Sequence, residues 1–218
     1  MIYFCQNILM IIKHRTKSSR NWLHRNFRDP YIKERNSKNL RARSWFKIKE
    51  IDERYNIFQI GMNVIDLGSS PGGWSEYLQK KIGFSGRVLA CDLLPMRPLN
   101  RIIFLKGDLT KKVILKKFIS LSEKYHWNAI VSDMSPNISG CSIIDNAKAF
   151  DLSDIAISIA DRVLSKQGYF IMKLFQGGDF SQYIKKIYNI FVKVKIFKPN
   201  SSRASSREIF IIAHGRKI

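Results

Sequence analysis

Acidic residues are scarce in this chain of 218 residues, where 17 Asp and Glu stand against 38 Lys and Arg. The formal net charge of +21 exceeds what solubility needs, and its self-repulsion is costly unless a polyanion is near. RNA, DNA or an anionic membrane surface could be that partner, and a lysine-rich genome composition is the alternative explanation. An enzyme acting on small molecules would not need this charge.

Cysteine is also scarce, and the chain has no long apolar run. Cys5, Cys91 and Cys141 form no Cys-x-x-Cys pair, so neither a disulfide framework nor a metal site is expected, and Cys91 is expected in the core. The apolar residues 1–12 are too few to span a bilayer, and no positive charge precedes them as in a secretion signal. We therefore expect a cytoplasmic protein without a membrane partner.

The composition divides the chain into three parts. Residues 1–12 are an apolar extension, and a translation start at Met10 would leave most of it out. Residues 13–45 are a basic arm, whose aromatic side chains could stack on RNA bases or, with Trp22 and Phe27 as anchors, fix a helix to the domain. Residues 46–218 suffice for one α/β core, expected to be monomeric.

From residue 63 onward, short β-rich runs alternate with segments of helical periodicity, which is typical of a parallel sheet covered on both faces. Strands are predicted at 63–68, 87–93, 102–107, 128–133, 168–175, 192–198 and 208–214, and helices at 73–82, 111–124, 147–164 and 179–191. The loop between the last two strands is too short for a crossover helix, so they should pair antiparallel. The pattern predicts a Rossmann-like methyltransferase fold, with a seven-stranded, mostly parallel sheet and an antiparallel last strand.

A glycine-rich turn at 66–74 joins a buried strand to a helix, where open α/β sheets bind ligands. Its spacing is not the Gly-x-Gly-x-x-Gly of dinucleotide sites, and we interpret it as a site for S-adenosylmethionine. Gly72 lets the backbone approach the ligand closely. Acidic residues end three consecutive strands, which predicts Asp66 near the ammonium group, Asp92 at the ribose hydroxyls and Asp108 at the adenine amino group.

A lysine lies inside an apolar strand: Lys173, within 168–175, must emerge at the carboxyl end of the sheet or be costly to bury. A lysine extending from an edge strand is the alternative. Methyl transfer to a hydroxyl needs a base, and Lys173 is a candidate. Asp133 ends the preceding strand, Glu208 begins the last one, and Lys47 could fold back over the site.

Serine and arginine dominate residues 201–207, a composition suited to phosphate and ribose oxygens, although a solvated turn is the alternative. Arg203 and Arg207 of this loop, together with Arg41, Arg43 and the basic arm, would form a positive track leading to the site.

Six segments of the chain resemble the FtsJ/RrmJ family, the large-subunit ribosomal RNA 2′-O-methyltransferases: 41–48, 66–74, 91–96, 132–140, 173–177 and 201–208. The resemblance extends from about residue 17 to residue 217. It implies a tetrad with Lys173 as the proton acceptor, formed by Lys47, Asp133, Lys173 and Glu208. It also implies cofactor contacts at Gly72, Trp74, Asp92, Asp108 and Asp133.

The substrate that the resemblance implies is a uridine ribose in the A loop of 23S rRNA, within the assembled large ribosomal subunit. Enzymes with similar motifs modify tRNA ribose or the mRNA cap, and these remain alternatives. A non-catalytic, RNA-binding assembly factor on the same fold is a further alternative. Such a factor should lack part of the tetrad, whereas all four residues are present here.

Overall fold

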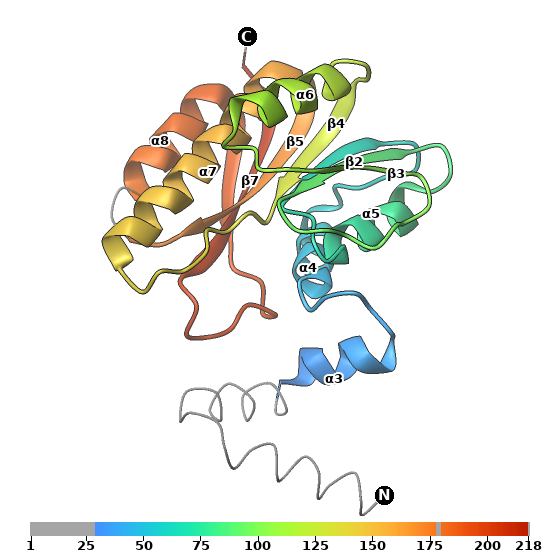
Figure 1. Ribbon diagram of the computed structural model, residues 1–218, viewed down its shortest axis with the longest axis horizontal. Coiled ribbons are helices and arrows are strands. Elements are labelled where there is room, and N and C mark those ends of the chain that lie inside the picture. The colour runs from blue at the N-terminus through green and yellow to red at the C-terminus, as the bar shows by residue number, and fades with distance from the viewer. Residues whose placement is uncertain (1–28, 178–179, 218) are drawn as a thin grey trace, which may run out of the picture.

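Seven strands form one sheet in the computed structural model, which describes residues 29–177 and 180–217 (Figure 1). They are β1 (Asn63–Leu67), β2 (Arg87–Asp92), β3 (Ile102–Lys106), β4 (Trp127–Ser132), β5 (Leu164–Phe175), β6 (Phe191–Phe197) and β7 (Glu208–Arg216). Their order is β3-β2-β1-β4-β5-β7-β6, and β7 runs antiparallel to both of its neighbours while β1 to β5 are parallel. This confirms the predicted Rossmann-like sheet with its antiparallel last strand.

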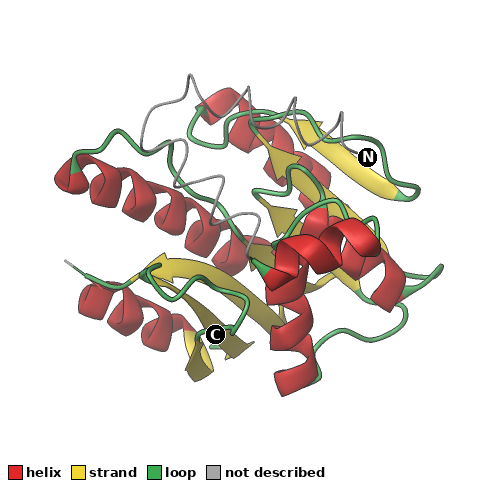
Figure 2. Cartoon of the chain, turned by 90° about the horizontal axis from the view of Figure 1, so that it is seen from below, coloured by secondary structure: helices red, strands yellow, loops and turns green. Residues whose placement is uncertain are grey.

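Helices cover both faces of the sheet (Figures 1 and 2). The helices α4 (Trp45–Tyr55) and α5 (Gly73–Ile82) pack on one face, and α6 (Lys112–Ser122), α7 (Ser142–Val163) and α8 (Phe180–Ile190) pack on the other. Neighbouring residues of β1 alternate between the faces: Val64 joins the α4–α5 core, whereas Ile65 joins the α6–α8 core. Two apolar cores therefore sandwich the sheet.

Most predicted bounds differ from the observed ones by a few residues. Helix α7 begins five residues before the predicted position 147, and β5 begins at Leu164 instead of 168. The arm, predicted at 13–45, contributes the short helix α3 (Pro30–Ser37), which lies after the Trp22 and Phe27 anchors of the helix considered for the arm. Helix α4, which begins at the end of the arm, was not predicted. Residues 1–28, with the apolar extension, Trp22 and Phe27, lie outside the described residues.

Helix α4 has an unusual buried face. Lys47 and Asp52 are buried there beside Ile48 and Ile51, and they interrupt the apolar stripe by which an amphipathic helix is found in a sequence. Asp52 accepts hydrogen bonds from the backbone N–H groups that follow the helix, at Ile57 (3.0 Å) and Phe58 (2.9 Å). These bonds fix the end of α4 and hence the direction of the helix that carries Lys47.

The strand ends beside the glycine turn are tied together. The N–H groups of Gly68 and Ser69 donate to the Cys91 oxygen at 2.9 and 3.2 Å, and the Asp133 N–H donates to the Leu67 oxygen at 3.0 Å. Gly68 has a φ of +76°, and a Cβ there would lie 2.8 Å from the Met134 backbone, so only glycine fits. As predicted, Cys91 is a core residue, and burial raises the pKa of its thiol to about 12.

Candidate active site

Strand register brings together three of the four residues predicted as a tetrad. Asp133 directly follows β4, which pairs with β5 so that Ser132 lies opposite Met172, the residue before Lys173. In the antiparallel pair of β5 and β7, Lys173 lies opposite Phe210, two residues from Glu208. Since side chains two residues apart share a face, Lys173 and Glu208 project from the same side of the sheet.

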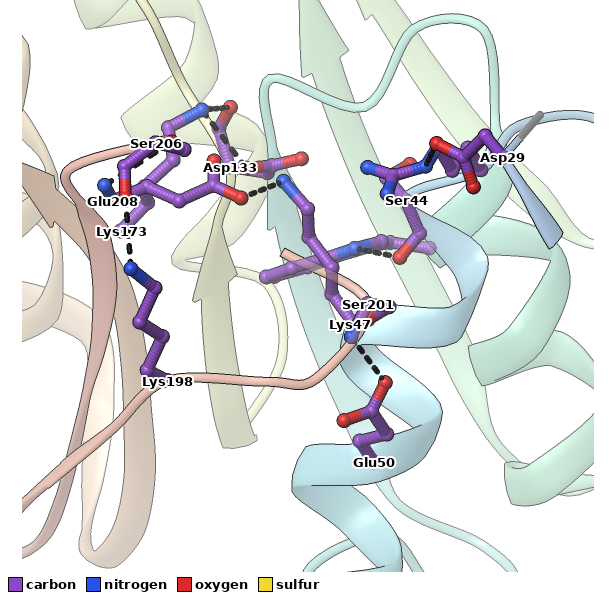
Figure 3. Close-up of polar contacts among 12 residues, drawn as sticks. Asp29, Ser44, Lys47, Glu50, Asp133, Lys173, Lys198, Ser201, Ser206 and Glu208 are labelled. Atoms are coloured by element: carbon purple, nitrogen blue, oxygen red, sulfur yellow. Dashed lines mark hydrogen bonds and ion pairs between the residues drawn. The ribbon is translucent and has the colours of Figure 1, made fainter. Parts of the chain in front are cut away.

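Two ion pairs connect these residues (Figure 3). The Nζ atom of Lys173 lies 2.8 Å from Oδ1 of Asp133 and donates a second hydrogen bond to the Asp133 backbone oxygen at 2.7 Å. The Nζ atom of Lys47, on α4, lies 2.7 Å from Oε1 of Glu208. Exposed side-chain fractions are 7% for Lys173, 14% for Asp133 and 11% for both Lys47 and Glu208, so both pairs are largely shielded from water.

The two pairs form one electrostatic cluster. Burial acts to raise the pKa of Asp133, but the charges of Lys173 and Lys47 outweigh it and hold that pKa below its ordinary value. Asp133 is therefore a carboxylate at neutral pH. Because Lys47 acts on Asp133 and is itself paired with Glu208, the two ion pairs belong to one group of charges.

Asp66 is completely buried on the α4–α5 side of β1. Its Oδ2 atom accepts a hydrogen bond from the Ser75 hydroxyl at 2.6 Å, and its Oδ1 atom is buried with no hydrogen-bond partner among the residues that the structure describes. Burial raises the pKa of Asp66 to about 7, while the Ser75 hydroxyl opposes the shift and the charges of Asp133 and Asp92 add to it. The site thus concentrates three carboxyl groups, an arrangement that favours a cationic ligand.

The other two predicted cofactor carboxylates are held by backbone donors. Oδ2 of Asp92 accepts from the Ser70 N–H at 2.8 Å, and Oδ1 accepts from the Leu94 N–H at 2.7 Å. Oδ1 of Asp108 accepts from the N–H and hydroxyl of Thr110, at 2.9 and 2.7 Å, and the hydroxyl bond is the main reason that the Asp108 pKa is lowered. Both groups are oriented before any ligand arrives.

The glycine turn holds Gly72 in a left-handed conformation, with a φ of +111°, just before α5. Trp74, two residues on, is buried: its Nε1 donates to the Ser44 oxygen at 2.8 Å, and its ring packs against Phe210. Since the indole is enclosed by the protein, a contact of Trp74 with a cofactor would have to use its backbone. The cofactor role of Trp74 stays a prediction.

Arg41 and Arg43, predicted to bind RNA, have partners within the chain. The guanidinium group of Arg41 donates to the backbone oxygens of Arg97 (2.6 Å) and Pro98 (2.8 Å). The Nε atom of Arg43 lies 2.8 Å from Oδ2 of Asp29, the residue that caps α3. Both arginines thus fix the arm and the loop after β2 beside the glycine turn, and their contact with RNA stays a prediction.

The serine-rich loop differs in part from its prediction. Ser201 and Ser202 are buried, so their hydroxyls do not face solvent as expected for contacts with RNA, and the plain solvated turn is also wrong for this half of the loop. Arg203 and Arg207 are exposed.

The N–H groups of Asn200 and Ser201 donate to the two carboxylate oxygens of Glu50, at 2.6 and 2.9 Å. Glu50 was not among the predicted site residues, although its place three residues after Lys47 on a helix would have put the two on neighbouring turns.

Within 29–177 and 180–217, no group of three His, Cys, Asp or Glu side chains is arranged to hold a metal ion. In the same part of the chain, no helix combines the length and apolarity required to cross a membrane.

Three features together define a Rossmann-like methyltransferase: a parallel sheet with an antiparallel last strand, a glycine turn beside oriented carboxylates, and a lysine near the carboxyl end of the interior strand β5. The chain belongs to the FtsJ-like methyltransferase family, which matches residues 40–216. It is 62% identical over 208 residues to the Ribosomal RNA large subunit methyltransferase E of Buchnera aphidicola subsp. Cinara cedri, covering 95% of this chain and 100% of that protein.

Solved structures share the fold at low sequence identity. A Plasmodium falciparum protein described as a ribosomal RNA methyltransferase matches with a TM-score of 0.71 and 20% identity, over 81% of this chain and 98% of that one. Aeropyrum pernix fibrillarin, solved with natively bound S-adenosyl-L-methionine, matches with a TM-score of 0.54 and 16% identity, over 71% of this chain and 67% of that one.

Proposed function

We propose that the chain is a monomeric, cytoplasmic enzyme that transfers a methyl group from S-adenosylmethionine to a ribose 2′-hydroxyl of large-subunit ribosomal RNA. The observation that carries the proposal is the pair of shielded Lys–carboxylate contacts, Lys173–Asp133 and Lys47–Glu208, beside the glycine turn. The name of the Buchnera relative supports large-subunit ribosomal RNA as the substrate. A uridine in the A loop of 23S rRNA is the target that the resemblance favours.

The residues around the glycine turn fit the cofactor. When bound, S-adenosylmethionine supplies a methyl group on a positively charged sulfur. The neighbouring carboxyl groups of Asp66 and Asp92 would offset the positive charge of such a ligand, and the partnerless Oδ1 of Asp66 is an acceptor for a donor that the described chain does not provide. Asp92, with both oxygens oriented by backbone N–H groups, retains lone pairs for two ribose hydroxyls.

Lys173 is positioned to accept the hydroxyl proton. Once its ammonium group has released one proton, Nζ of Lys173 has two N–H bonds and one lone pair, and the two hydrogen bonds to Asp133 direct both N–H bonds away from the substrate. The lone pair is then left for the proton. Nζ of Lys173 would take the proton of the 2′-hydroxyl, and the bound cofactor would supply the methyl group to the oxygen.

Asp133 keeps Lys173 in place during this step, and Lys47 and Glu208 act on the ribose. Asp133 holds Nζ through two contacts, and its carboxylate stabilises the ammonium ion that forms when Lys173 takes the proton. Lys47 and Glu208 neutralise each other at 2.7 Å and can orient the ribose from the other side.

The test is methylation of large subunits from a strain whose own enzyme is deleted. Purified protein and tritiated S-adenosylmethionine are added, and the labelled nucleotide is mapped by nuclease protection. Label on a 2′-oxygen of large-subunit RNA is the expected result. Label only on tRNA or on capped mRNA would redirect the proposal to those alternatives, and no label on any RNA would favour a non-catalytic assembly factor.

A further inference from the structure

The loop between β6 and β7 (residues 198–207, the β6–β7 loop) is attached to helix α4 at both of its ends. At its start, the carboxylate of Glu50 accepts from the N–H groups of Asn200 (2.6 Å) and Ser201 (2.9 Å). Just past its end, Glu208 pairs with Lys47 at 2.7 Å. Figure 3 shows Lys47 and Glu50 reaching from one helix toward these two points.

The contact of Glu50 is suited to holding backbone in place. Each carboxylate oxygen accepts from one of two consecutive N–H groups, and hydrogen bonds to an ionised acceptor are stronger than neutral ones. The Ser201 side chain is fully buried at this point, so the start of the loop is anchored by packing as well as by charge.

Further hydrogen bonds hold the part of the loop that carries its arginines. Lys198 Nζ donates to the Ser206 oxygen at 2.9 Å across the loop, and the Gln176 N–H, after β5, donates to the Arg207 oxygen at 2.9 Å. The Ser206 N–H donates to the Arg203 oxygen at 2.9 Å. The backbones of Arg203 and Arg207 are therefore fixed relative to β5, the strand of Lys173.

We propose that Glu50 is a positioning residue for the RNA substrate: it holds the β6–β7 loop against α4, so that Arg203 and Arg207 meet the RNA backbone in register with Lys173. The inference rests on the proposed function, because it assigns the loop to the RNA of that reaction. Glu50 acts through the loop and touches neither the cofactor carboxylates nor the tetrad in the contacts described above.

The experiment compares Glu50→Ala and Glu50→Gln with Glu53→Ala, a control on the same helix whose carboxylate pairs only with Lys49 on the described surface, at 3.1 Å. The RNA concentration for half-maximal methylation should rise about tenfold in Glu50→Ala and less in Glu50→Gln, which keeps one acceptor oxygen. Half-saturation by S-adenosylmethionine should stay close to that of the unaltered chain, and the melting temperature should fall by only a few degrees, because two hydrogen bonds are lost. A purely structural role would also lower the melting temperature but would leave both half-saturation values unchanged.

Amide hydrogen exchange tests the anchoring without catalysis. The amides of Asn200 and Ser201 should be protected in the unaltered chain and exchange faster in Glu50→Gln, while β7 amides keep their protection. Unprotected amides in the unaltered chain, or an unchanged RNA half-saturation in Glu50→Ala, would overturn the inference. If the unaltered chain methylates no RNA, the proposed function fails, and the exchange rates still decide whether Glu50 anchors the loop.

Discussion

Lys173 donates to Asp133 twice, through the carboxylate at 2.8 Å and through the backbone oxygen at 2.7 Å. The hydrogen bond to the carboxylate alone would fix Nζ at a single contact and would allow the amine to rotate around it. The second bond comes from a main-chain atom that β4 holds in place, so the position of Nζ is set by the sheet itself. A base held in this way needs little rearrangement before it accepts a proton.

Replacing Lys173 by methionine should abolish methyl transfer and preserve cofactor binding. The variant keeps the length of the side chain and lacks the amine, and positioned bases contribute about 100-fold or more to such rates. Single-turnover methylation at saturating cofactor, together with calorimetric binding of S-adenosylmethionine, measures the two effects. Lys166→Met, an exposed position on β5, is the matched control. Substantial activity in the Lys173 variant would remove it from the role of base.

Asp66 should make the protein less stable as the pH rises. Burial raises its pKa from 3.8 to about 7, so the native state binds this proton more tightly than the unfolded chain does, and the free energy of unfolding falls between these two values. Asp66→Asn removes this contribution and should be more stable relative to the unaltered chain at pH 8 than at pH 5. Urea unfolding at both values measures it, with exposed Asp151→Asn as the control. Parallel pH dependences in the two chains would count against a raised pKa.

The Lys47–Glu208 pair should show strong coupling in a double-mutant cycle. Lys47→Met leaves a shielded carboxylate without its partner and should cost about 3 kcal/mol of unfolding free energy. Adding Glu208→Gln should recover about 1 kcal/mol or more, because the unpaired charge disappears. The exposed Lys49–Glu53 pair on the same helix, at 3.1 Å, is the reference and should couple by only about 0.5 kcal/mol. Equal coupling in both pairs would contradict the burial argument.

RNA affinity should fall steeply with salt. Each phosphate that a cation neutralises adds about 0.7 to 0.9 to the slope of log affinity against log salt concentration. Removing one such contact with Arg203→Ala or Arg207→Ala should lower the slope by about that amount, whereas Lys166→Ala, on the far part of β5, should not. Fluorescence anisotropy with an RNA fragment at several salt concentrations provides the slopes. A flat response would show that the charge of +21 serves another purpose.

The sequence predicted much of the site because the relevant residues are tied to strand ends. Periodicity located β1 to β7 within a few residues, and parallel strands bring their carboxyl ends to one edge. Asp92, Asp133 and Lys173 could therefore be placed near one another before any contact was known. Lys173 was recognisable because burying a charged side chain within an apolar strand is costly unless the charge reaches a partner or the end of the sheet.

Contacts between distant segments could not be predicted in the same way. Helix α4 has no clean apolar stripe, since Lys47 and Asp52 take part in its buried face, and its position depends on partners in α5 and the β6–β7 loop. The sequence separation between Glu50 and Ser201 is 151 residues, and no local pattern reports such a bond. The burial of the Ser201 hydroxyl likewise depends on what packs over it.

By itself, the sequence determined the class of fold, the glycine turn and the end of the sheet at which the acidic residues and Lys173 gather. The reason is that hydrophobic periodicity, turn chemistry and charge are local properties of a chain. Tertiary structure alone decided which charge pairs with which: Lys47 with Glu208, Lys173 with Asp133, and Glu50 with the backbone of a distant loop. It also left Asp66 fully buried, with one oxygen that no group in the described part of the chain contacts by a hydrogen bond. The physical reason is that pairing and burial depend on distances between segments, which exist only once the sheet and its helices have packed.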